Sequence, residues 1–73
     1  MERIRVNTIE DRSLYEKTLI VYELLMRTLD DLNEAYYRTP SFISSKIYIL
    51  RSINRVKAGI NLCRELLNAM KNV

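Results

Sequence analysis

Few residues in this 73-residue chain could do chemistry, and their spacing does not bring them together. Histidine is absent, so a general base would have to be a carboxylate, a lysine, a tyrosine or the single thiol. The acidic cluster of Asp30, Asp31 and Glu34 could offer oxygens to a divalent cation, but no loop with ligand spacing accompanies it. We interpret the cluster as a solvated helix face. We therefore predict a non-enzymatic chain with no catalytic residue, no metal site and no cofactor.

The thiol of Cys63 is the other reactive group, and it is the only cysteine of the chain. It could act as a nucleophile or a redox sensor, but it sits in an apolar stripe that carries no group to activate it. The spacing favours a small buried hydrophobe. A lone cysteine forms no disulfide within the chain, and structural zinc prefers Cys and His ligands.

The beginning of the chain lacks the apolar core of a signal peptide, and charges interrupt every apolar run before about 20 residues. We expect no membrane span, a reduced thiol and a cytoplasmic location.

Residues 40–72 are predicted to form the second of two helices, and their apolar residues carry the strongest pattern in the chain. Spacings of four and three alternate without interruption, which is typical of a coiled-coil seam on one stripe of an α-helix. The seam consists of Ile49, Ile53, Val56, Ile60, Cys63, Leu67 and Met70.

The first helix is predicted over residues 8–37, because no glycine or proline interrupts it. Residues 1–7 before it are predicted to form an extended or disordered tail. The break falls at Thr39-Pro40, where Thr39 suits the N-cap of the second helix and Pro40 its first turn. The chain is then a single domain of two helices.

A short connection folds the second helix back antiparallel to the first. The seam predicted for the first helix is Tyr15, Leu19, Tyr22, Met26, Leu29, Asn33 and Tyr36. Pairing the two seams layer by layer sets Tyr36 against Phe42 and Tyr22 against Val56, and it lets Asn33 meet Lys46. A matched polar layer of that kind fixes register.

A second apolar stripe follows one side of both predicted helices, and one hairpin cannot cover it. Two hairpins can do so by forming a four-helix bundle about a two-fold axis. The predicted fold is therefore an all-α antiparallel helical hairpin that dimerises into a four-helix bundle. The predicted dimer interface comprises Leu14, Val21, Leu25, Leu32, Tyr48, Gly59, Leu62 and Leu66.

A separate apolar patch, Ile43, Ile47 and Leu50, lies near the connection and away from that interface by helix geometry. Exposed apolar clusters often mark protein contacts, so we expect a protein partner there. The alternative is that Ile4 and Val6 of the N-terminal tail fold over the patch or over a neighbouring hairpin. With both surfaces in view, the sequence favours a non-catalytic protein–protein interaction module, such as a small adaptor, regulator or chaperone-like protein.

Charge supports an alternative function, because residues 39–73 hold six basic and one acidic side chain. Residues 3–9 alternate polar and apolar, with Arg3, Arg5 and Asn7 on one face. This segment resembles the strand of a ribbon-helix-helix protein, and the resemblance implies a small basic DNA-binding dimer whose paired strands enter the major groove. The resemblance covers about seven residues. The ribbon-helix-helix fold also needs the first helix to end after about a dozen residues. Arg51 and Arg55 would add phosphate contacts.

Overall fold

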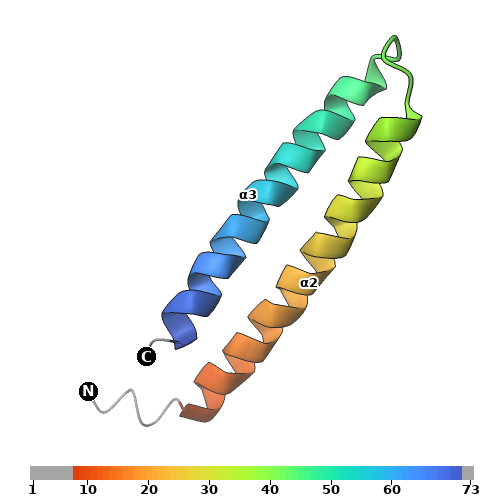
Figure 1. The fold of residues 1–73 in the computed structure, drawn as a ribbon. Helices are drawn as coiled ribbons and strands as arrows, with labels where there is room; N and C mark the ends of the chain where they lie inside the picture. Colours follow the sequence, from red (N-terminus) through yellow and green to blue (C-terminus); the bar gives the residue numbers. More distant parts are fainter. Residues whose placement is uncertain (1–7, 72–73) are drawn as a thin grey trace.

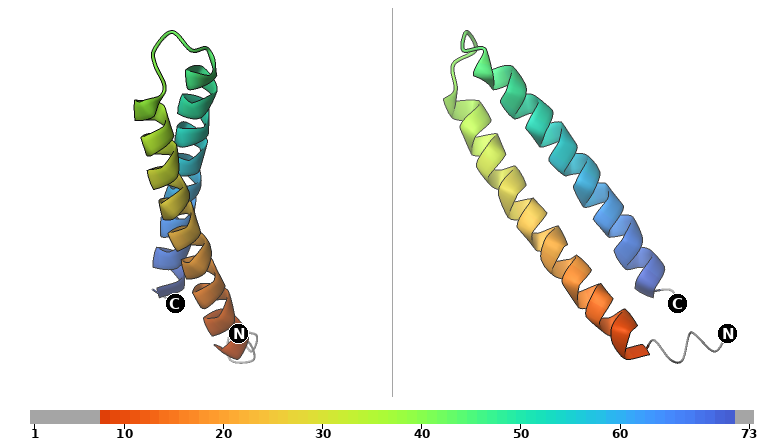
Figure 2. Two further views of the ribbon diagram at one scale, coloured as in Figure 1. Left: turned by 90° about the vertical axis from the view of Figure 1, so that its right-hand side faces the viewer. Right: turned by 180° about the vertical axis from the view of Figure 1, so that it is seen from behind.

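The structure, a computed structural model, describes residues 8–71, with side chains described from Arg12 onward. Two α-helices form the described chain: α2 (Thr8–Arg38) and α3 (Ser45–Lys71). They run antiparallel and side by side, joined at one end of the molecule by residues 39–44 (Figure 1). The views in Figure 2 show the two rods crossing at a shallow angle. The predicted all-helical hairpin is confirmed. Neither described helix is long and apolar enough to cross a lipid bilayer.

The connection corrects the predicted start of the second helix, which is Ser45 and not Pro40. Thr39 closes the preceding helix: its amide donates to the Ala35 carbonyl at 3.1 Å, and its hydroxyl donates to the same oxygen at 2.7 Å. A hydroxyl engaged in this way does not cap the following turn. The chain then makes a turn before α3 begins, in which the Ile43 amide donates a hydrogen bond to the Pro40 carbonyl at 3.1 Å.

The core lies along α3, where the predicted seam is confirmed. Ile53, Ile60, Cys63 and Leu67 are the buried residues of this helix, each no more than 9% exposed. The remaining seam positions, Ile49, Val56 and Met70, are half-buried. The unbroken heptad spacing therefore identified the stripe that faces α2.

The inward stripe of α2 differs from the predicted one in its alternate layers. Leu19 and Met26 are exposed, whereas the half-buried stripe is Tyr15, Thr18, Tyr22, Leu25, Leu29, Leu32 and Tyr36. Both stripes have the same spacing. The observed one differs by a rotation of α2 about its own axis that is smaller than the angle between successive residues, and this rotation brings Thr18 into the seam. Its hydroxyl donates to the Leu14 carbonyl at 2.7 Å, which satisfies the polar group inside the interface.

Register is also displaced from the prediction. A Cβ built on Gly59 would meet Leu25 Cδ1 at 3.4 Å, so these two residues lie at the same level. Tyr22 is then level with the Ile60–Cys63 turn and not with Val56. The layer of Tyr36 with Phe42 is wrong, because Phe42 is 83% exposed in the connection. The longer connection shifts the pairing by about six residues along α3, more than one and a half helical turns.

Candidate interaction surface

Among the described residues, more large hydrophobic side chains are exposed than fully buried. Its radius of gyration is 17.0 Å, against about 11 Å for a compact domain of this length. Its accessible surface is 6031 Å², against roughly 4,700 Å² for a compact protein of this mass. Fourteen large hydrophobic residues are exposed, compared with four buried core residues. The surface between and beside the helices is therefore the candidate site.

We call the apolar stripe on one side of the hairpin the leucine face. Its predicted members Leu14, Val21, Tyr48, Leu62 and Leu66 are all exposed, between 46% and 63%. Helix periodicity places the α2 and α3 members on the same side, and Gly59 marks where the two helices meet on it. Among residues 12–71, nothing covers this face.

Three other predicted interface residues lie partly inside the hairpin. Leu25, Leu32 and Gly59 are half-buried, because the observed rotation of α2 turns both leucines toward α3. The neighbour of Gly59 is the Leu25 side chain at an ordinary contact distance, and no backbone approaches there within the chain. These residues form the inner edge of the leucine face.

One exposed residue of this face was missed from the sequence. Leu24 is 54% exposed and lies one turn from Val21 on the outer side of the face. Its signal was present: it continues a row with Leu14 and Val21 at helical spacing. Taking the wrong seam for α2 moved the face away from Leu24.

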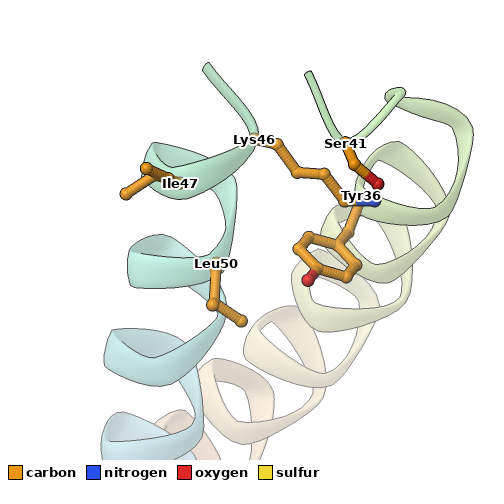
Figure 3. A pocket seen from close by; sticks show the side chains of 5 residues that line it. All are labelled: Tyr36, Ser41, Lys46, Ile47 and Leu50. Atoms are coloured by element: carbon orange, nitrogen blue, oxygen red, sulfur yellow. The ribbon is translucent and has the colours of Figure 1, made fainter. Parts of the chain in front are cut away.

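The predicted partner patch spans the connection and the N-terminal turns of α3. Ile43, Ile47 and Leu50 are all exposed, with Ile47 at 56%. In Figure 3, Leu50 points toward the Tyr36 ring of α2 and Ile47 points away from it. Tyr36, Ser41, Lys46, Ile47 and Leu50 line a shallow hollow. Leu50 therefore forms the side of the patch that faces α2, and Ile47 forms the side that is open to solvent.

Lys46 has a different partner from the predicted one. Its Nζ lies 4.3 Å from the centroid of the Tyr36 ring, over the hollow, where the sequence had set it against Asn33. A lysine ammonium over an aromatic face is attracted by the ring quadrupole. This contact ties the first turn of α3 to the last turns of α2 and fixes one wall of the hollow.

Ile4 and Val6, the alternative cover for this patch, lie outside the described residues, but the length of the chain limits their reach. Residues 1–7 precede Thr8, which lies at the end of the hairpin opposite the connection. Seven residues span at most about 25 Å. From Thr8 to the level of Leu50 the helix rises by roughly 39 Å. Ile4 and Val6 could reach this patch only on another molecule.

Residues that could act as metal ligands do not cluster in the part of the chain that the structure describes. No group of three or more potential metal-ligating residues forms among the described residues. Cys63 is buried, in the packing role that its spacing predicted. From Glu16 onward the acidic side chains of α2 are exposed, and Glu34 is engaged by Arg38 at 2.7 Å.

The residues of the nucleic-acid alternative are placed only in part. Arg51 and Arg55 are exposed on α3, and the Arg51 guanidinium lies 5.3 Å from the Tyr48 ring centroid. Arg3, Arg5 and Asn7 lie outside the described residues. α2 runs for 31 residues without interruption, so the short first helix of the ribbon-helix-helix fold is not formed. No protein family, curated protein or solved structure that was compared matches the chain.

Proposed function

We propose that this protein is a non-catalytic protein–protein interaction module that works as a homodimer, in which two hairpins bury their leucine faces in a four-helix bundle. The observation that carries the proposal is the excess of exposed over buried large hydrophobics. A monomer rarely keeps such a continuous apolar surface in water. Hairpins of this kind are covered most simply by a second hairpin.

Energetics support this proposal. Complete burial of a leucine- or valine-sized side chain is worth about 1.5–3 kcal/mol. Six residues, each roughly half exposed, would contribute on the order of 5–9 kcal/mol per chain, and two chains twice as much. This sum exceeds most estimates of the entropic cost of association, which run from about 4 to 15 kcal/mol. The estimate rests on Leu14, Val21, Leu24, Tyr48, Leu62 and Leu66.

The direct test places one charge on each side of α3. Leu62→Glu puts a carboxylate on the leucine face, so the dimer dissociation constant should rise by a factor on the order of 100 or more. The matched control is Asn68→Glu, an exposed position whose spacing puts it on the other side of the same helix, and it should leave association unchanged. Sedimentation equilibrium measures both. Equal effects of the two variants would refute the proposed interface.

A different protein is proposed to bind the patch of Ile43, Ile47 and Leu50. A helix with spaced apolar residues suits an apolar strip beside a shallow hollow. Affinity capture with the wild type should recover a protein that Ile47→Asp loses and that the control Asn68→Asp, near the far end of α3, retains. Identical captured proteins for all three would remove the patch as a binding site.

Duplex nucleic acid is the second candidate, favoured by the exposed Arg51 and Arg55 on a helix with one acidic residue. Phosphate contacts of this kind weaken steeply with salt. A gel shift with generic duplex at low and high salt tests it, with Arg55→Glu as the weakened variant. Absence of a shift at micromolar protein and low salt eliminates this candidate.

A further inference from the structure

Charge divides between the two helices in a way that selects how a second copy would sit. α2 carries seven acidic and four basic side chains, net −3, whereas α3 carries six basic and one acidic, net +5. Among the described side chains, the ion pair is Arg38–Glu34 within α2, and none joins the two helices. The opposite charges of the helices therefore stay available to a neighbouring molecule.

Two arrangements of a four-helix bundle keep all neighbouring helices antiparallel. With both connections at the same end, α2 of each chain lies beside α3 of the other. With the connections at opposite ends, each helix lies beside its own copy. The first arrangement sets −3 against +5 at both new contacts, and the second sets like against like. Like charges along a shared flank are destabilising.

We infer that the second copy docks on the leucine face with both connections at the same end, so that the two-fold axis runs along the bundle. This inference rests on the proposed homodimer and specifies its geometry. Antiparallel neighbours also let the helix dipoles oppose one another in either arrangement, so the dipoles do not decide between them. The net charges of the helices do.

Axial register gives this arrangement a specific contact. Leu25 is level with Gly59, so Asp31, six residues further along α2, is level with Ile53. A two-fold axis along the bundle sets the partner's α3 at the same height. Asp31 then lies between the partner's Arg51 and the partner's Arg55. All three positions are exposed in the single chain, on the flanks beside the leucine face.

One consequence is functional. The same-end arrangement brings both copies of the Ile43–Ile47–Leu50 patch to one end of the bundle. A single partner helix, or two, would then meet a doubled apolar surface there. The opposite-end arrangement would place the two patches toward opposite ends of the bundle.

Spin-label distances test the arrangement separately from dimerisation. In a Cys63→Ala background, one label is placed at Ser41→Cys in the connection and, in a second protein, at Ala58→Cys near the middle of α3. Helices in a bundle lie about 8–10 Å apart, so two Ala58 labels should give a distance under roughly 35 Å in either dimer.

The Ser41 labels separate the two arrangements. The inference expects a distance under roughly 35 Å between them as well. A Ser41 distance near the hairpin length, with a short Ala58 distance, overturns the arrangement and leaves the dimer standing. No distance at either position at micromolar protein overturns the dimer and the arrangement together. Unlabelled Cys63→Ala must first show the same mass as the wild type by sedimentation.

Discussion

Ile60 and Leu62 are two residues apart on α3 and similar in size and polarity, yet Ile60 is 4% exposed and Leu62 is 61% exposed. The difference is the face that each occupies: Ile60 lies in the seam with α2, and Leu62 lies on the leucine face, mostly open to solvent. A helix needs only one apolar stripe to pack in a hairpin. The second stripe therefore indicates a surface for another molecule.

Truncating each side chain gives the largest test of this contrast. Ile60→Ala leaves a cavity in the seam and should lower the free energy of unfolding by about 2–5 kcal/mol at every protein concentration. Leu62→Ala should cost less than about 1 kcal/mol where the chain is monomeric and more where it is dimeric. Chemical denaturation followed by circular dichroism at two concentrations measures both. A concentration-independent cost at Leu62 would contradict the contrast.

Gly59 lies between the two faces and gives a smaller effect. Its Cβ would sit 3.4 Å from Leu25 Cδ1, an ordinary contact, so Gly59→Ala fits within the hairpin. Alanine should then stabilise the monomeric hairpin by about 0.5–1 kcal/mol through helix propensity.

The same methyl group would obstruct close approach of a second hairpin on the leucine face. Gly59→Ala should therefore weaken dimerisation while it stabilises the monomer. Denaturation at low concentration and sedimentation at high concentration separate the two effects. A tighter dimer would show that no backbone packs against this glycine.

Much of the hairpin could be predicted from the sequence, and the seam of α3 shows why. Its apolar residues are confined to heptad positions, so the inward stripe has no competitor. On α2, apolar residues occupy nearly every direction between Leu14 and Met26, and two stripes of equal spacing compete. Periodicity alone cannot choose between them, because packing against α3 decides the rotation.

The predicted register between the two helices was wrong for a related reason. Thr39 and Pro40 have the residue types of a helix start, but the Thr39 hydroxyl bonds back to Ala35. The Thr39 amide bonds to the same carbonyl, so Thr39 closes α2 and does not cap the next helix, and α3 begins only at Ser45. Every layer below then shifts. The exposed residues of α3 were less affected, because a shift along the axis leaves the faces of that helix where they were.

The smallest predicted effect lies at the connection, where the two helices are held by a polar contact and not by the seam. Lys46→Met removes the ammonium from the Tyr36 ring but keeps the aliphatic stem. An exposed cation–π contact is worth about 0.5–1 kcal/mol, so unfolding should become easier by that amount at most. Thermal denaturation of Lys46→Met beside the control Lys57→Met measures it. Equal shifts would show that the contact stabilises nothing.

The mass of the wild-type chain in solution tests the central claim most directly. Sedimentation equilibrium across nanomolar to micromolar concentrations should show a reversible transition from the 8.7 kDa chain to twice that mass. The exposed leucine face would then have its predicted occupant. A mass that stays at 8.7 kDa throughout, with the helices intact by circular dichroism, would contradict the account.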